Sequence, residues 1–223
     1  MTSLEAVDPV ELAEAAGRVG NRMRQYAARW GTVAETQTPF SPVVDGHVLP
    51  ADPWTALGTG TAADVPLVVG HTRDEIRSFT RAAGQDHRDW LCRMPSARLA
   101  YAGAAAGAPT HLFELAYTVP QRDGILGAPH SADHPLVFGN FCGGIADRYY
   151  VQPVAADTEG LGNRMRRAWA DFAHTGNPGW APFTPETLRT MVFDTESTEQ
   201  RYPHAVNLEA YGRDFPEVLD LLV

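Results

Sequence analysis

His130 stands in a sequence context that suits a proton-transferring histidine. It follows the turn Gly127-Ala128-Pro129, Asp133 comes three residues later, and an apolar run then ends at Gly139-Asn140. A histidine that moves a proton between a nucleophile and a leaving group sits on a loop at the mouth of a cleft, and an acid fixes its tautomer. The residue types around His130 therefore indicate a candidate general base, although most loop histidines are simply solvated.

Acidic residues that could orient this histidine lie upstream, after an apolar run of strand length. Residues 65–69 are apolar, Gly70 ends the run, and Asp74 and Glu75 follow in a polar segment. Taken alone, an acid after a strand is usually a helix cap or a surface charge. Both carboxylates nevertheless come soon after a predicted strand, in the loop that would follow its end.

Three strings of this sequence resemble the type-B carboxylesterases, the branch of the α/β-hydrolases that includes bacterial esterases and the cholinesterases. Residues 127–140 resemble the family's catalytic-histidine loop, in which Gly-Ala-x-His is followed by an acid and by Pro-x-Val-Phe-Gly. Residues 66–75 resemble the segment in which Thr-x-Asp-Glu supplies the triad acid, and residues 39–46 resemble the string Pro-Phe-x-Pro-Val-Val-Asp-Gly. Since α/β-hydrolases order their triad as serine, acid, histidine, the resemblance implies that Glu75 orients His130, with Asp74 as the alternative.

The sequence contains no recognisable nucleophile elbow. The elbow reads Gly-x-Ser-x-Gly, because a sharp strand-to-helix turn needs small flanking residues. Two positions before the six serines stand Met1, Pro39, Ile76, Met94, Pro129 and Thr195, none of which is glycine. The single Gly-Gly pair, Gly143-Gly144, follows a cysteine and not the histidine of an oxyanion-hole motif. Because family members carry both features in their N-terminal half, the chain resembles the C-terminal half alone.

Apolar runs of strand length alternate with helical periods, which predicts an α/β architecture. Strands are expected at 65–69, 110–119 and 190–194, and helices at 8–30, 73–83, 161–175 and 215–222, with a helix across 89–106 that Pro95 divides. No stretch resembles a linker, so we expect one domain over residues 1–223. By resemblance it is the C-terminal portion of an α/β-hydrolase fold, a partial sheet with flanking helices.

Composition argues against nucleic acid and membranes as partners. The chain has 18 basic and 27 acidic residues and a formal net charge of −9, which disfavours phosphate backbones and anionic lipid surfaces. Residues 1–14 lack the basic start and apolar core of a signal peptide, and no apolar run reaches the about 18 residues that a membrane span needs. We therefore expect a cytoplasmic location by default, while full-length relatives can be secreted.

The resemblance implies the hydrolysis of a small-molecule carboxylic ester, with no metal or organic cofactor. In that reaction a serine attacks the ester carbonyl, the histidine takes and returns the proton, and the glutamate holds the imidazolium. His130 and Glu75 would supply the last two functions, and an N-terminal half would supply the nucleophile. We expect the chain on its own to be inactive.

Other interpretations of the sequence remain open. The chain could be a non-catalytic remnant or interaction module, or one half of a split esterase completed in trans. Its strands resemble inner strands of a larger sheet, so an exposed sheet edge and self-association are expected. His130 and His134 also form a His-x3-His pair, a zinc spacing on a helix, but Gly127, Pro129 and Pro135 favour a loop, and the sequence suggests no third ligand.

Overall fold

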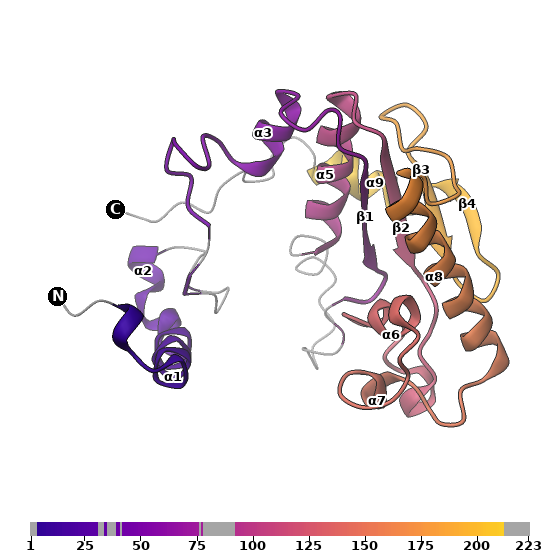
Figure 1. The fold of residues 1–223 in the computed structure, drawn as a ribbon, viewed down its shortest axis with the longest axis horizontal. Coiled ribbons are helices and arrows are strands. Elements are labelled where there is room, and N and C mark those ends of the chain that lie inside the picture. The colour runs from indigo at the N-terminus through magenta and orange to yellow at the C-terminus, as the bar shows by residue number, and fades with distance from the viewer. Residues whose placement is uncertain are drawn as a thin grey trace. The chain divides into compact units, whose positions relative to one another are not determined.

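The computed structural model describes residues 4–30, 34, 39–40, 42–75, 77 and 92–211. The chain, for which the sequence predicts one domain, divides into two compact units: residues 1–52 with 215–223, and residues 53–214. Figure 1 shows the helices and strands of both units. The helix expected at 215–222, most of the one at 73–83 and the first residues of the one at 89–106 lie outside the described residues.

The first unit begins with short helices. They are η1 (Leu4–Ala6), α1 (Pro9–Gly20), η2 (Met23–Tyr26) and α2 (Ala27–Trp30). Helix α1 starts where the sequence predicts, because Asp8 Oδ1 accepts the N–H of Val10 at 2.8 Å and Pro9 occupies the first turn. The single helix expected over 8–30 is wrong: α1 ends at Gly20, and glycine costs a helix about 1 kcal/mol relative to alanine.

The string at residues 39–46 ends in a turn at Asp45-Gly46. Asp45 Oδ1 accepts the backbone N–H groups of His47 at 2.9 Å, Val48 at 2.9 Å and Leu49 at 3.0 Å, and Gly46 has a φ of 74°. These backbone hydrogen bonds, that of His47 first, lower the pKa of Asp45. A carboxylate that accepts several N–H groups therefore closes this loop locally.

The second unit is built on a four-stranded sheet with the order β1-β2-β3-β4 (Figure 1). The strands are β1 (Leu67–Thr72), β2 (Thr110–Leu115), β3 (Arg189–Phe193) and β4 (Thr198–Arg201). The first three are parallel to one another, with Leu67 beside Thr110 and Leu112 beside Thr190, and β4 runs antiparallel to β3. The predicted strands are confirmed, with β1 ending nearer the acidic residues than expected. Strand β4 was not predicted, because its Thr-Glu-Gln-Arg sequence is exposed throughout and shows no apolar alternation.

Helices cover both faces of this sheet. On one face α8 (Ala156–Thr175) packs Trp169 edge-on against Phe113 of β2, with 4.9 Å between ring centroids. On the other face α5 (Met94–Ala105) brings Gly103 so close to Thr110 that a Cβ would lie 2.8 Å from the threonine hydroxyl oxygen. Shorter helices complete the unit: α3 (Pro53–Gly58), η5 (Gln121–Gly124), α6 (Asp133–Phe138), α7 (Ala146–Tyr149) and α9 (Ala205–Tyr211). Partly parallel strands enclosed by helices are the α/β layering that the sequence predicts.

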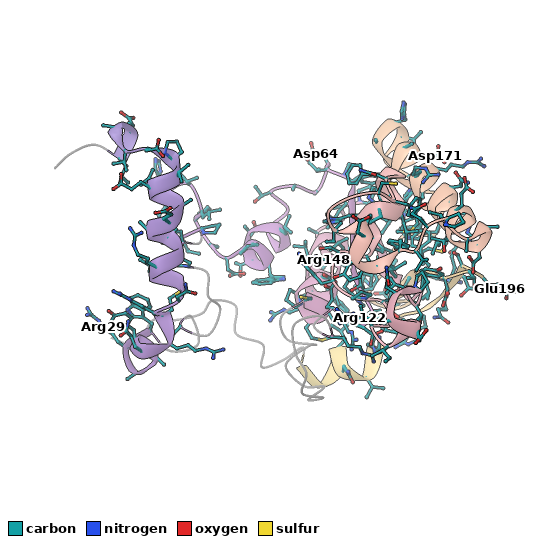
Figure 2. The ribbon with its side chains drawn as sticks, turned by 90° about the horizontal axis from the view of Figure 1, so that it is seen from below. Arg29, Asp64, Arg122, Arg148, Asp171 and Glu196 are labelled. Carbon is teal, nitrogen blue, oxygen red and sulfur yellow. The ribbon has the colours of Figure 1, made fainter. Side chains whose placement is uncertain are left out.

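The core lies between β2, β3 and α8. It contains the buried side chains of Phe113, Leu115, Leu161, Met165 and Phe193. Charged side chains such as Asp171 and Glu196 point outward from the second unit (Figure 2). Among the helices of the described part of the chain, none is long and apolar enough to cross a membrane.

Candidate active site

The acidic loop begins where β1 ends. The backbone N–H of Arg73 donates to Leu115 O at 2.9 Å, which continues the contact between β1 and β2 by one residue. The N–H of Thr72 donates to Glu75 Oε1 at 2.8 Å, so the loop folds back and holds the glutamate carboxylate against the strand end. Glu75 is only 9% exposed. A carboxylate tied to the backbone in this way has a defined orientation.

The histidine loop is tied directly to the acidic loop. Asp74 N donates to Ala128 O at 2.8 Å, and Ala128 N donates to Asp74 Oδ2 at 3.0 Å. The N–H of His130 donates to Glu75 O at 3.2 Å. Gly127, with a φ of 63°, has no room for a side chain, because a Cβ there would overlap the Asp74 carboxylate. The glycine that opens the histidine string thus permits the close approach of the two loops.

The two side chains singled out by the sequence meet across these loops. His130 Nδ1 lies 2.5 Å from Glu75 Oε2, although the residues are 55 positions apart. The histidine side chain is 50% exposed and that of the glutamate 11%. Because a carboxylate only accepts, Nδ1 carries the proton in this contact, which makes Nε2 the basic nitrogen of a neutral imidazole. This arrangement can perform general acid–base chemistry at Nε2.

Asp74, the alternative acid, is engaged elsewhere. Besides Ala128 N–H, its carboxylate pairs with Arg77 Nη2, 2.8 Å from Oδ1. Both of its oxygens therefore hold the loop, and the geometry favours Glu75 as the acid that orients His130.

The segment after His130 corrects one expectation. A loop was expected there because of Pro135, but Asp133–Phe138 forms helix α6, in which Pro135 is the third residue and the helix needs no N–H from it. His134 lies exposed on this helix, while His130 precedes it. Within the described residues, no group of three or more His, Cys, Asp or Glu side chains could hold a metal ion.

Asp133 lies at the first position of α6. Burial raises the pKa of its carboxyl, the charges of His134 and His130 act in the opposite direction, and that of Glu75 adds to the rise. Asp133 is thus a second acid whose protonation is sensitive to the charge state of the Glu75–His130 pair.

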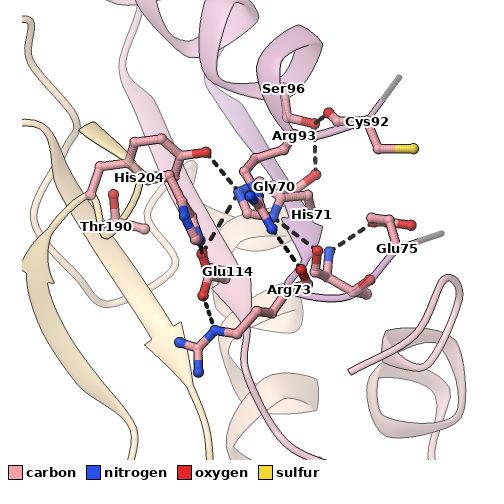
Figure 3. A network of polar contacts seen from close by, with 12 residues as sticks. Gly70, His71, Arg73, Glu75, Cys92, Arg93, Ser96, Glu114, Thr190 and His204 are labelled. Atoms are coloured by element: carbon pink, nitrogen blue, oxygen red, sulfur yellow. Dashed lines mark hydrogen bonds and ion pairs between the residues drawn. The ribbon is translucent and has the colours of Figure 1, made fainter. Parts of the chain in front are cut away.

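A buried polar cluster lies next to the acidic loop (Figure 3). The sequence analysis did not predict it. Glu114 of β2 is fully buried, and Arg73 Nε donates to its Oε1 at 2.6 Å. His71 is 3% exposed and borders the same cluster. A charged residue in the middle of an apolar strand, His111-Leu-Phe-Glu114-Leu115, was the signal that could have revealed it.

The profile of the carboxylesterase family matches residues 78–210. This chain belongs to the carboxylesterase family, and its second unit is part of an α/β-hydrolase fold.

Individual relatives extend the similarity beyond the profile. The para-nitrobenzyl esterase of Bacillus subtilis (strain 168) is 26% identical over 206 residues, covering 74% of this chain and 42% of the relative. The probable N-octanoylanthranilate hydrolase AqdA2 of Rhodococcus erythropolis is 28% identical over 185 residues, covering 71% of this chain and 40% of the relative. A solved structure of PNB esterase superposes with a TM-score of 0.75 at 23% identity, over 92% of this chain and 48% of the other. The chain thus spans less than half the length of these relatives.

Proposed function

We propose that this chain supplies the acid and the base of a serine carboxylic-ester hydrolase, with Glu75 as the orienting acid and His130 as the general base. The observation that carries the proposal is the 2.5 Å contact between His130 Nδ1 and Glu75 Oε2, with the carboxylate nearly buried and the imidazole half exposed. A histidine whose Nδ1 is fixed by a carboxylate, and whose side chain is half exposed, has the arrangement that proton transfer to a substrate requires.

The reaction would proceed in two acyl-transfer steps. His130 Nε2 takes the proton of a serine hydroxyl as the serine oxygen attacks the ester carbonyl, and returns it to the leaving alkoxide. Water then attacks the acyl-enzyme. His130 takes the proton of that water and returns it to the serine oxygen as the carboxylic acid leaves. Glu75 stabilises the imidazolium that forms in each step and stays ionised throughout. The substrate is a small-molecule carboxylic ester, in keeping with the similarity of the chain to para-nitrobenzyl esterase.

The nucleophile and the oxyanion donors belong to residues outside this chain. None of the six serines lies in Gly-x-Ser-x-Gly. Ser131 is next to the base, but it follows His130 directly in a left-handed conformation, with a φ of 64°, and is not presented by a strand-to-helix turn. The missing groups would come either from a preceding segment of a longer polypeptide or from a second chain.

A polypeptide that joins a nucleophile-bearing segment to these residues tests the proposal. The coding sequence upstream of Met1 is searched for Gly-x-Ser-x-Gly, and the longer product is assayed with a short-chain nitrophenyl ester. His130→Ala should lower kcat by about 10⁴–10⁶ and Glu75→Gln by about 10⁴. His134→Ala, an exposed neighbouring histidine, is the matched control and should retain activity within a few-fold. Full activity of His130→Ala would refute the proposal.

A second candidate is a non-catalytic interaction module, and the exposed edge of the sheet favours it. Within the described part of the sheet β1 pairs only with β2, so the other side of β1 is without a strand neighbour. Its first four residues, Leu67 to Gly70, are partly exposed, although the strand is apolar there. An N-terminal half or a second copy of the chain could add a strand at this edge. Absence of activity in the longer polypeptide, together with stable binding at this edge, would favour the module.

A further inference from the structure

Glu114 is an unusual residue for its position, because a buried carboxylate is energetically unfavourable. All six residues of β2 are buried, and Glu114 is the only acid among them, with no exposed surface. Burying a carboxylate costs several kcal/mol even after relaxation, and an apolar side chain would often serve stability as well or better. Packing alone therefore does not explain why this strand contains a charged residue.

Three basic side chains from different segments surround this carboxylate (Figure 3). Arg73 Nε of the acidic loop lies 2.6 Å from Oε1, while His204, just before α9, places Nε2 3.0 Å from Oε2. His71 Nε2 of β1 lies 3.9 Å from Oε2. Burial alone would raise the pKa of Glu114, but His204, His71 and Arg73 outweigh it and lower the pKa to about 2. Glu114 is therefore ionised at neutral pH and forms a charge-assisted bond with a guanidinium that is always charged.

His71 extends the cluster toward the backbone of the acidic loop. Burial lowers its pKa to about 4, so the imidazole is neutral at neutral pH. Nδ1 lies 3.1 Å from Thr72 O, which only accepts, so Nδ1 donates and Nε2 accepts from the Tyr202 hydroxyl at 3.0 Å. The carbonyl of Thr72 is thereby held, and the side chain of the next residue, Arg73, is anchored on Glu114.

Thr72 is the residue whose N–H fixes the orienting acid. That N–H binds Glu75 Oε1 at 2.8 Å, leaving Oε2 for His130 Nδ1. On the other side, Arg93 Nη2 donates to Arg73 O at 2.7 Å, so the peptide groups before and after Arg73 are both restrained. A connected path leads from Glu114 through Arg73 and Thr72 to the catalytic pair.

We propose that Glu114 is a positioning residue, which through Arg73 and the His71–Thr72 contact aims the Thr72 N–H and so sets the orientation of Glu75 toward His130. The inference rests on the proposed function of the Glu75–His130 pair. Glu114 touches neither Glu75 nor substrate and acts only by restraining residues 71–73. Its loss leaves Glu75 present but free to turn away from the imidazole.

The tautomer of His130 reports the orientation of Glu75. A carboxylate at Nδ1 holds the proton there, whereas isolated imidazole side chains favour the Nε2–H form. The chain is prepared with ¹⁵N-labelled histidine, and ring nitrogen shifts are recorded near pH 9, well above the ordinary histidine pKa of about 6.5. His130→Gln assigns the His130 signals, and Glu75→Ala shows the spectrum without the orienting acid.

The test compares Glu114→Gln, Arg73→Gln and Arg73→Lys. We expect Glu114→Gln and Arg73→Gln to reduce the Nδ1–H population of His130 by about twofold or more, toward the Glu75→Ala spectrum, with Arg73→Lys between Arg73→Gln and the unchanged chain. Arg73 is 40% exposed, so its variants keep the test decisive if Glu114→Gln fails to fold. Arg164→Gln is the matched control, because Arg164 also binds backbone carbonyls, those of Asp194 and Thr195, away from the site; it should leave the tautomer unchanged.

The possible results separate this inference from the proposed function. An unchanged His130 spectrum in folded Arg73→Gln, with a clear change in Glu75→Ala, overturns the positioning role of Glu114 and keeps the catalytic pair. A His130 spectrum that does not respond even to Glu75→Ala overturns the pair itself. A change of equal size in Arg164→Gln would show that general loosening of the unit moves the tautomer, and would also overturn the positioning role.

Discussion

Gly70 of β1 lies directly against Phe113 of β2. A Cβ built on Gly70 would overlap both the ring and the backbone carbonyl oxygen of Phe113. The two residues are also register partners in the parallel ladder, so neither strand can move away without breaking their hydrogen bonds. The glycine that ends the apolar run thus allows β1 to pair closely with β2, just before the acidic loop.

Gly70→Ala should destabilise the second unit by roughly 2–4 kcal/mol, because a backbone oxygen cannot yield as a flexible side chain can. Gly160→Ala in α8 is the control: its nearest neighbour is Arg164 Nη1 at 3.8 Å, and alanine should stabilise the helix by about 0.5–1 kcal/mol. Urea unfolding followed by circular dichroism measures both. Equal stability of the two variants would contradict the close packing at Gly70.

Removing the Asp74 carboxylate should loosen the two loops of the site. Asp74→Ala leaves Ala128 N–H without its acceptor, so we expect a loss of about 1–3 kcal/mol in the free energy of unfolding. Arg77→Ala removes the ion pair to the same carboxylate and a long, exposed hydrogen bond of 3.4 Å to Ile125 O, and the Arg77 side chain is 42% exposed, so its cost should stay below about 1 kcal/mol. If Arg77→Ala proves as costly as Asp74→Ala, the ion pair and not the loop-to-loop bond is the dominant contribution.

His71 should make stability fall in mild acid. Its pKa is lowered by burial to about 4, against about 6.5 in an unfolded chain, so the unfolded state gains a proton first as the pH drops. Its contribution is complete above pH about 6.5 and is lost between about 6.5 and 4, with an upper bound of about 3 kcal/mol. The charged groups that face it are Glu114, Arg93 and His204.

Chemical denaturation at pH 7 and pH 4.5 measures this dependence. His71→Gln should be less stable than the unchanged chain at pH 7 and should lose less stability between the two pH values. His111, whose pKa is also lowered by burial, keeps part of the slope in the variant. An unchanged slope in His71→Gln would show that His71 is not buried in its neutral form.

Residues 1–223 alone should not hydrolyse esters at an enzymatic rate. A Glu-held histidine can act as a weak general base on water, but loss of one oxyanion donor typically costs about 10²–10³ in kcat, and none of the six serines lies in a nucleophile elbow. Purified chain with a short-chain nitrophenyl ester should give the background rate, unchanged by His130→Ala. Burst kinetics, or labelling of any serine by a fluorophosphonate probe, would reveal a hidden nucleophile.

The free side of β1 should make the chain self-associate or bind a partner. Apolar residues of a parallel strand expect neighbours on both sides, and unpaired backbone groups at an edge recruit another strand. Sedimentation at low micromolar concentration should therefore show species larger than a monomer, and Val69→Lys, at a partly exposed position of β1, should reduce them. A stable monomer that binds no hydrophobic dye would count against this prediction.

Local patterns in the sequence were sufficient for strands β1 to β3, the start of α1 and the strings that carry Glu75 and His130. These features depend on neighbouring residues: apolar runs bounded by glycine, a capping aspartate, a proline that fits the first turn. The family resemblance pointed to the proposed acid and base, since each stands in a string whose order can be read directly along the chain.

Tertiary structure alone decided what these residues touch. Glu75 and His130 are 55 positions apart, and Arg73 and Glu114 are 41 apart, so no local pattern encodes their contacts. The buried state of Glu114 and His71 depends on three segments closing around them, and the exposed polar strand β4 forms only because β3 offers it a partner. Side-chain pairing over such distances follows from how the sheet and its loops pack, which is why the sequence indicated Glu75 and His130 as candidates but did not indicate the buried cluster around Glu114.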